Sequence, residues 1–321
     1  MIKSCFIKRI LYCLLFLLAV ANNLNSMDKT YHYITSSNGY SAVVFDDILL
    51  RAKMFFPHIY RNINKETEVK NILYDTYFGI SYNNKSFWLP ERPEECEYLG
   101  YLPGTGIITV RRKFEDIETT EYIFSPMTLN SSGVVMIIKA RVLKDIDEIS
   151  LFSIHNFHLG LENNSVTFKS ERILYDKSDI YIESSESSPY LVAYKPLTDG
   201  TIHAATPVNP YDIVKSGKKL TNVEDSGITD DAVCGFEKDF YLLKSGDEVW
   251  FGILVLFDDK NEKERLIDTA DDFIQGRSVQ NILNSEIIFW QEYFSRLDSD
   301  KKSVILSDAV LSEAVAVSYT H

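Results

Sequence analysis

Two histidines three residues apart, in the segment His155-Asn156-Phe157-His158, are the residues whose type and spacing most suggest chemistry. Imidazole can ligate a metal or move a proton near neutral pH. In a strand, residues three apart face opposite sides of the sheet, so a shared metal would need a bend or bulge and a third, distant ligand. The simpler interpretation is a pair of structural histidines whose hydrogen bonds are satisfied locally. We expect neither a metal nor a cofactor, and keep His155 and His158 as candidate carbohydrate contacts.

Aromatic side chains beside polar ones are the second chemical signal. Flat rings stack on the apolar face of a pyranose while amides and carboxylates bond its hydroxyl groups. The segment Phe87-Trp88-Leu89-Pro90, with Tyr98 and Tyr101, has the composition for such a surface. The other interpretation places Trp88 in the core, as is common in β-sandwiches. Trp88 and Tyr98 are therefore candidate carbohydrate-binding residues.

No residue of the sequence stands in a catalytic signature. Glycoside cleavage needs two carboxyl groups at a defined separation, one with a raised pKa, and the many acids here single out no pair. The chain contains neither GxSxG nor GxxxxGK[ST]. Gly104-Thr105-Gly106 lacks a third glycine and precedes a strand, so it predicts a turn and not a dinucleotide-binding loop. We name no catalytic residue.

The N-terminus has the pattern of a secretory signal peptide over residues 1–21. An uncharged, Leu-rich run, Ile10 to Ala21, follows three basic residues and ends in the small residues Ala19-Val20-Ala21. The run is shorter than the ~20 residues of a membrane span, so no membrane contact is expected beyond this peptide, although an uncleaved anchor is the alternative. The sequence thus predicts export, to the periplasm or the extracellular space.

Charge and cysteine content limit the partners of the mature chain. Cleavage removes Lys3, Lys8 and Arg9 and takes the formal charge from −13 to −16, which disfavours nucleic acid and suits neutral ligands. Of the four cysteines, Cys96 and Cys234 remain as the one pair able to form a disulfide, and their spacing does not decide whether they meet. They lack the CxxC spacing of a structural zinc site.

The chain from residue 28 to 258 predicts a mainly β domain. Short β-branched or alternating stretches, separated by Gly, Asn, Asp and Pro clusters, are typical of an all-β sandwich. Their number suits a large antiparallel supersandwich of two packed sheets. The clearest candidate strands are Ile107–Phe114, Glu118–Phe124, Val134–Val142, Ile149–Ile154 and Val249–Phe257.

Helical periodicity begins after Asp258. Apolar residues over 261–297, including an aromatic face around Trp290, predict linker helices. A further apolar segment, 303–321, shows no helix stop signal. We interpret it as the truncated first helix of a domain that continues beyond His321; a C-terminal helix that docks on the sandwich is the alternative.

Six segments in this order resemble the N-terminal β-domain of bacterial glucoamylase-like glycoside hydrolases, family fifteen. They are Asn38-Gly39-Tyr40, Phe56-Pro57-His58-Ile59-Tyr60, Leu73-Tyr74-Asp75-Thr76-Tyr77-Phe78-Gly79, Trp88-Leu89, Tyr122-Ile123-Phe124-Ser125-Pro126 and His155-Asn156-Phe157-His158-Leu159-Gly160. In that family a β-supersandwich precedes a linker helix and an (α/α)6 toroid. The resemblance implies that the catalytic glutamates belong to the toroid, which this chain lacks.

Three hypotheses follow from these features. The first is the non-catalytic N-terminal portion of an exported glucoamylase-like hydrolase of α-glucan metabolism, partnered by a separate or downstream (α/α) toroid and by a neutral α-glucan or oligosaccharide. The second is a stand-alone exported carbohydrate-binding β-sandwich protein. The third is an independent enzyme that uses the His155 and His158 region.

Overall fold

The computed structural model describes residues 33–57, 71–159, 170–176, 179–186 and 188–300. The chain divides into two units after His32, and all described residues belong to the second, Tyr33–His321. The predicted signal peptide (1–21) and the predicted C-terminal helix (303–321) lie outside the described residues.

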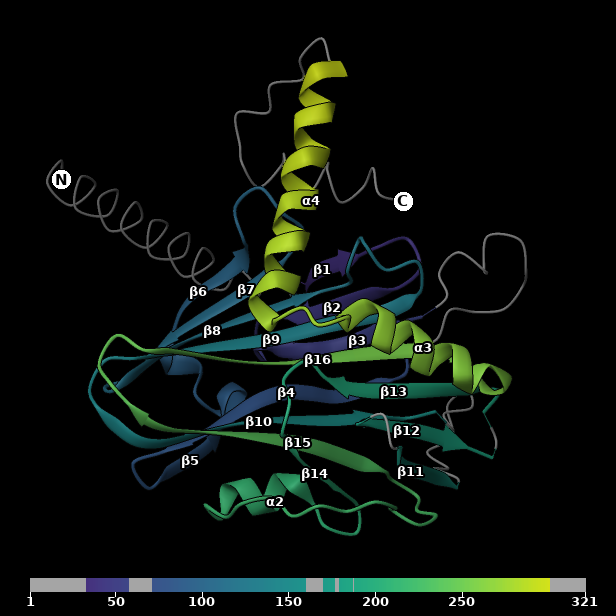
Figure 1. The fold of residues 1–321 in the computed structure, drawn as a ribbon, viewed down its shortest axis with the longest axis horizontal. Coiled ribbons are helices and arrows are strands. Elements are labelled where there is room, and N and C mark those ends of the chain that lie inside the picture. The colour runs from purple at the N-terminus through teal and green to yellow at the C-terminus, as the bar shows by residue number, and fades with distance from the viewer. Residues whose placement is uncertain (1–32, 58–70, 160–169, 177–178, 187, 301–321) are drawn as a thin grey trace, which may run out of the picture. The chain divides into compact units, whose positions relative to one another are not determined.

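Two antiparallel sheets form the framework, each with eight strands among the described residues (Figure 1). Sheet A has the order β1-β2-β3-β4-β10-β15-β14, with β5 paired to β4, and sheet B has the order β11-β12-β13-β16-β9-β8-β7-β6. The strands of sheet A are β1 (Tyr33–Ser37), β2 (Ala42–Asp46), β3 (Arg51–Phe56), β4 (Leu73–Tyr82), β5 (Lys85–Trp88), β10 (Ile146–Phe157), β14 (Ile202–Ala205) and β15 (Val233–Leu243). Those of sheet B are β6 (Cys96–Tyr101), β7 (Ile108–Lys113), β8 (Ile117–Phe124), β9 (Ser132–Val142), β11 (Glu171–Asp176), β12 (Ile180–Ser185), β13 (Tyr190–Pro196) and β16 (Glu248–Asp259).

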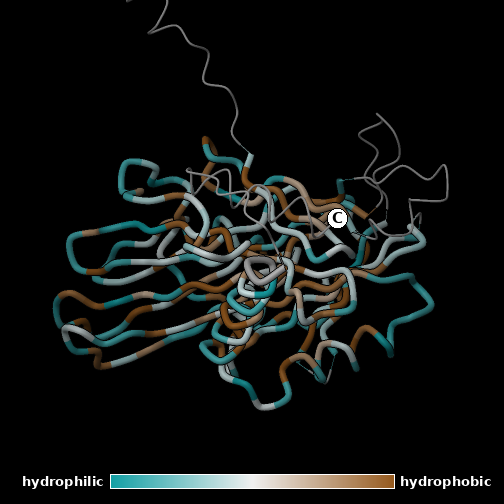
Figure 2. The backbone as a smooth tube through the Cα atoms, turned by 90° about the horizontal axis from the view of Figure 1, so that it is seen from above, coloured by the Kyte–Doolittle hydropathy of each residue, from teal (hydrophilic) through white to brown (hydrophobic). Residues whose placement is uncertain are grey.

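The two-sheet β-sandwich predicted from the sequence is confirmed. All five of the clearest candidate strands form, as β7, β8, β9, β10 and β16. Figure 2 shows apolar stretches along the strands and many hydrophilic turns between them. The predicted turn at Gly104-Thr105-Gly106 is also present, and Gly104 takes a φ of +72° there.

The main core lies between the sheets, and a second apolar layer lies outside sheet B. Along β16, Phe251, Ile253 and Val255 enter the core between the sheets, whereas Leu254 and Leu256 face the opposite way. Because β16 is covered on both faces, its sequence is a continuous apolar run instead of an alternating one. The same is true of β9, which pairs with β16 along ten residues.

Helices α3 (Lys263–Ile274) and α4 (Val279–Asp300) provide that second cover, as the periodicity over 261–297 predicts. Leu266, Ile267, Ala270 and Phe273 of α3 pack on the outer face of sheet B together with Trp290 of α4. In Figure 1 both helices lie on the sheet B side, whereas α2 lies on the side of sheet A. None of the helices in the described segments is both long and apolar enough to cross a membrane.

Helix α2 (Pro210–Lys215) interrupts a region where the sequence predicts only strands. Asn209 caps it by accepting a hydrogen bond from the Tyr211 amide, and Pro210 occupies the first turn, so the local signal is ordinary helix-start chemistry. The other helices of the described segments are single 3₁₀ turns: η2 (Leu89–Glu91), η3 (Pro93–Glu95) and η4 (Lys260–Glu262).

Hydrogen bonds of Asn38 link the edge of sheet A to sheet B. Its Nδ2 lies 3.0–3.1 Å from the carbonyl oxygens of Pro126, Leu129 and Ser131, which follow β8. Its Oδ1 accepts a hydrogen bond from the Ser41 amide at 3.0 Å. Two of the segments that carry the family resemblance, around Asn38 and before Pro126, therefore meet in space.

Candidate functional site

His155 and His158 face opposite sides of sheet A, as their spacing predicts. His155 points into the core, where its Nδ1 lies 2.8 Å from Thr76 Oγ1 and its Nε2 lies 3.0 Å from Ser153 Oγ. Its ring also stacks on Tyr194 of sheet B. Complete burial lowers the pKa of His155 to about 3, so this imidazole is neutral at physiological pH. It is a structural histidine with no solvent-facing side for a ligand.

The interior around His155 also contains a buried acid. Tyr194 donates a hydrogen bond to Glu183, and both side chains are completely buried. Burial raises the pKa of Glu183 well above its usual value and so favours the protonated carboxyl group. The group is enclosed between the sheets and therefore serves packing, not substrate contact.

His158 lies at the end of β10 under an exposed aromatic ring. The ring of Tyr74 stacks on it with centroids 4.8 Å apart and planes 18° apart. Tyr74 is 52% exposed, whereas His158 is 4% exposed. The imidazole thus supports the tyrosine from below, and much of the phenol ring remains open to solvent.

A β-bulge places Tyr74 in this position. In the pairing of β10 with β4, Asn156 lies opposite Asp75 but Phe157 lies opposite Leu73. Tyr74 is the extra residue between these two pairs, and a bulge of this kind turns a side chain out of the regular alternation. Sequence reasoning singled out His158 but not Tyr74, because nothing in Leu73-Tyr74-Asp75 marks a bulge before the partner strand is known.

Polar groups surround the stacked rings. Asp231, from the loop before β15, accepts a hydrogen bond from Asn156 Nδ2 at 2.9 Å and lies 3.4 Å from His158 Nε2. Hydrogen bonds from His158 and Asn156 lower the pKa of Asp231, so it is a carboxylate at neutral pH. Asp75 lies 2.7 Å from an Arg51 guanidinium nitrogen, although burial raises its pKa. Lys53 Nζ lies 5.6 Å from the centre of the Tyr74 ring.

This arrangement, which we call the Tyr74 site, has the groups that contact with a polyhydroxyl ligand requires. The exposed ring offers an apolar plane, Asp75 follows Tyr74 in β4, and Asp231 lies beside His158, so both acids place hydrogen-bond acceptors near the stacked rings. Asn156 Oδ1 is buried without a hydrogen-bond partner among the described residues. Within the described segments, no group of three or more His, Cys, Asp or Glu side chains is arranged to hold a metal ion.

The other two candidate residues do not join the Tyr74 site. Trp88 is completely buried beneath α2, where its ring lies parallel to Tyr211 and its Nε1 donates to the Tyr211 carbonyl at 3.2 Å. It has no exposed face on which a sugar can stack, so the core interpretation describes it. Tyr98 lies on β6, the edge strand of sheet B, with Arg111 4.8 Å from its ring centre. The candidates thus fall in four separate places.

Cys96 and Cys234 are free thiols. Cys96 is half-buried on β6, at one edge of sheet B, whereas Cys234 is buried on β15 of sheet A. Phe236 of β15 contacts Tyr181 of β12, six strands across sheet B from β6. At about 4.8 Å per strand, this separation is far beyond the reach of a disulfide.

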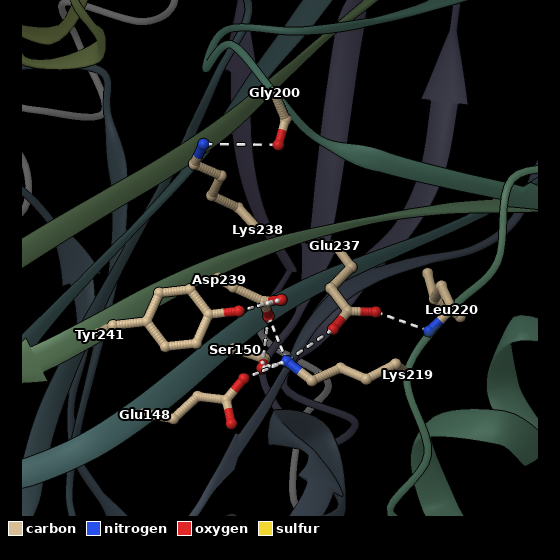
Figure 3. A network of polar contacts seen from close by, with 9 residues as sticks. All are labelled: Glu148, Ser150, Gly200, Lys219, Leu220, Glu237, Lys238, Asp239 and Tyr241. Carbon is tan, nitrogen blue, oxygen red and sulfur yellow. Dashed lines mark hydrogen bonds and ion pairs between the residues drawn. The ribbon is translucent and has the colours of Figure 1, made fainter.

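A cluster of charged groups lies on the outer face of sheet A (Figure 3). Lys219 Nζ lies 2.5 Å from Asp239, 2.6 Å from Glu148 and 3.2 Å from Glu237. Burial raises the pKa of Glu237 to about 7, opposed by a hydrogen bond from the Leu220 amide. One lysine thus forms ion pairs with three carboxyl groups. These pairs link the segment after α2 to β10 and β15.

The fold and the Tyr74 site define a class: an antiparallel two-sheet β-sandwich with an aromatic, acid-flanked surface site. No family model and no curated protein matches the chain. Among solved structures, the chain is similar to a bacterial glucoamylase in complex with acarbose, at 12% sequence identity and a TM-score of 0.53. The match covers 83% of this chain and 39% of that one, so this chain spans less than half of the glucoamylase.

Smaller sandwich proteins give weaker matches. One is a GalM/aldose epimerase homologue from C. elegans, with 7% identity, a TM-score of 0.46, and coverage of 72% of this chain and 99% of that one. Another is a galactose mutarotase related enzyme from Lactobacillus acidophilus, with 10% identity, a TM-score of 0.42, and coverage of 71% and 98%. At these identities the glucoamylase likeness concerns the fold alone, and the two smaller proteins add no argument.

Proposed function

We propose that this chain is a carbohydrate-binding β-domain, the non-catalytic portion of an exported glucoamylase-like glycoside hydrolase that acts on α-glucans. The observation that carries the proposal is the exposed Tyr74 ring held flat on His158 between carboxylates. The fold likeness to a glucoamylase, over 83% of this chain, supports the choice of hydrolase class. The catalytic groups then belong to an (α/α) toroid, either downstream or on a separate chain.

Calorimetric titration of the full chain with maltoheptaose tests the binding. We expect saturable binding that weakens about tenfold or more in Tyr74→Ala, because the stacking of a sugar ring on the tyrosine is lost with the side chain. Tyr241→Ala is the matched control, since Tyr241 is 60% exposed on β15 of the same sheet but lies beside Asp239, in the Lys219 cluster. Equal losses in the two variants, or no binding to any α-glucan, would contradict the proposal.

The non-catalytic part is tested separately. We expect the purified chain to release no reducing sugar from maltoheptaose over a period in which a glucoamylase digests it completely. Activity that persists in Tyr74→Ala and in every other surface variant would point to a contaminant. Activity that disappears with Tyr74 would make the chain an enzyme in its own right. The expected partner is an (α/α) toroid, encoded directly downstream or elsewhere in the same genome.

A further inference from the structure

A pocket of about 770 Å³ opens beside the segment that crosses from β13 in sheet B to β14 in sheet A. Its walls are this crossing segment, the first residues of β16 and the turn between α3 and α4. The volume lies within the range of small-molecule sites in proteins. Phe240 of β15 lines the pocket, and its pairing partner in β10 is Ile149. The Tyr74 site lies beside Asn156, seven residues further along β10. At about 3.4 Å per residue, the two places are more than 20 Å apart.

An ion pair holds the two sides of the pocket together. Lys195 Nζ, on β13, lies 3.2 Å from Asp271 Oδ1, on α3. The Lys195 side chain is 13% exposed and the Asp271 side chain is 51% exposed, so water reaches the carboxylate and screens the pair in part. The pair links β13 to α3 across this wall of the pocket.

One polar atom in the lining lacks a partner. Thr198 Oγ1 is buried and makes no hydrogen bond with the described residues. Buried hydroxyl groups in folded proteins are nearly always hydrogen-bonded, to protein, water or ligand. Because Thr198 lines the pocket, a rotation of its side chain would bring this hydroxyl group to a hydroxyl group of a bound molecule.

The pocket also contains the one tryptophan that is not buried. Trp88 and Trp290 are at most 2% exposed, whereas Trp250 is half-buried, and all three lie in the part of the chain that the structure describes. The Trp250 ring runs parallel to Tyr122, with planes 7° apart, and Lys139 Nζ lies 5.5 Å from its centre. These neighbours pack beside the Trp250 ring, which forms part of the pocket lining.

The charge of the lining selects the class of ligand. Four acids and two cations line the pocket: Asp179, Asp199, Glu248, Asp271, Lys195 and Arg277. Lys195 pairs with Asp271 and Lys139 pairs with Glu248, and Lys238 Nζ lies 2.6 Å from the Asp199 carbonyl oxygen, so the region carries little net charge. A lining of this kind does not attract phosphates or other ions strongly. Carboxylates, the Thr198 hydroxyl and the Gln280 amide instead suit a ligand rich in hydroxyl groups.

We propose that this pocket binds a short neutral oligosaccharide, with a sugar ring stacked on Trp250 and a sugar hydroxyl bonded to Thr198. It would be a second carbohydrate site, and it rests on the proposed function only for the class of its ligand. The Tyr74 site and this pocket lie far enough apart to be tested independently.

Tryptophan fluorescence reports on the pocket, because only Trp250 among the three tryptophans reaches solvent. The full chain is titrated with maltoheptaose and, in parallel, with neutral hexasaccharides of β-linked glucose, xylose and N-acetylglucosamine. We expect a saturable change in emission and protection of Trp250 from acrylamide quenching with at least one of them. Thr198→Val should raise the dissociation constant about fivefold or more while the chain stays folded, since the hydroxyl makes no bond within the protein.

Thr119→Val is the matched control. Thr119 Oγ1 is likewise buried without a hydrogen bond among the described residues, but it lies on β8, away from the pocket lining. This variant should leave the dissociation constant unchanged, and Tyr74→Ala should leave the fluorescence response intact. The proposal is overturned if no saccharide changes the emission, or if the response is the same in Thr198→Val and in the native chain. A response that vanishes in Tyr74→Ala but survives in Thr198→Val also overturns it and leaves the Tyr74 site standing.

Discussion

The ring of Tyr74 lies on the imidazole of His158, with the two planes 18° apart and the centroids 4.8 Å apart. His155, only three residues earlier, lies on the opposite face of the same sheet and stacks on Tyr194 in the core. The two histidines of one short segment therefore have different physical roles. One supports a surface ring, and the other fills a polar position between the sheets.

This difference predicts opposite results for two alanine variants. His158→Ala removes the support of Tyr74 and should weaken maltoheptaose binding several-fold while the melting temperature changes by only a few degrees. His155→Ala opens a cavity and removes one of the two hydrogen-bond partners of Thr76 Oγ1, the other being Met136 Sδ, so it should cost about 2–4 kcal/mol of folding stability.

Calorimetry for binding and urea unfolding followed by circular dichroism for stability separate these effects. The folded fraction of His155→Ala should bind maltoheptaose with the native dissociation constant, because His155 has no exposed surface. Equal stability losses in the two variants would show that the division of roles is wrong.

Glu286 predicts how stability depends on pH. This buried carboxyl group of α4 accepts hydrogen bonds from the Met127 amide, at 3.1 Å, and from Trp290 Nε1, at 2.9 Å. Burial raises its pKa from 4.5 to about 7. Because the folded chain binds this proton more tightly than the unfolded chain, the stability from Glu286 is complete below pH 4.5 and is lost as pH rises towards 7.

Glu286→Gln should therefore flatten the pH dependence. The glutamine carbonyl oxygen can accept the same hydrogen bonds without a charge, as the protonated acid does. From the pKa shift, the native chain should lose on the order of 3 kcal/mol from this group between pH 4.5 and 8. Urea unfolding at both pH values measures the difference, with the exposed Glu264→Gln on α3 as the control. A native pH slope in Glu286→Gln would contradict the assignment.

The sequence predicts the strands and the two C-terminal helices well, because their apolar patterns directly record which faces are covered. The runs of β9 and β16 are apolar throughout because helices cover the outer face of one sheet and the other sheet covers the inner face. Helix α2 was missed because it spans only six residues, although Asn209-Pro210 is a recognisable start signal.

The candidate site was only partly predictable. The alternation rule places His155 and His158 on opposite faces, and it needs no knowledge of the fold. Tyr74 and Asp231 join His158 only through strand pairing across more than seventy residues, which no local pattern encodes. Trp88 was a candidate on composition alone, and the helix that buries it lies more than a hundred residues further along the chain.

Gly106 and Trp290 form the contact that seats α4 on sheet B. A Cβ atom added at Gly106 would lie 2.5 Å from Cζ2 of Trp290 and 2.9 Å from its Cη2. These are ring atoms of a side chain that is only 2% exposed, so the ring has little room to move. Gly106→Ala should therefore displace Trp290 and cost about 1–3 kcal/mol of folding stability.

A double-mutant cycle with Trp290→Leu tests this contact. The smaller leucine leaves space for the new methyl group, so Gly106→Ala should cost less in that background, with a coupling energy of about 0.5–3 kcal/mol. Gly104→Ala is the control, because Gly104 has a φ of +72° and no atom within 4 Å of an added Cβ. Its cost comes from the backbone alone and should be the same whether residue 290 is tryptophan or leucine. Urea unfolding followed by circular dichroism gives all six stabilities, and additivity at Gly106 as well as at Gly104 would mean that the tryptophan does not hold α4 in this way.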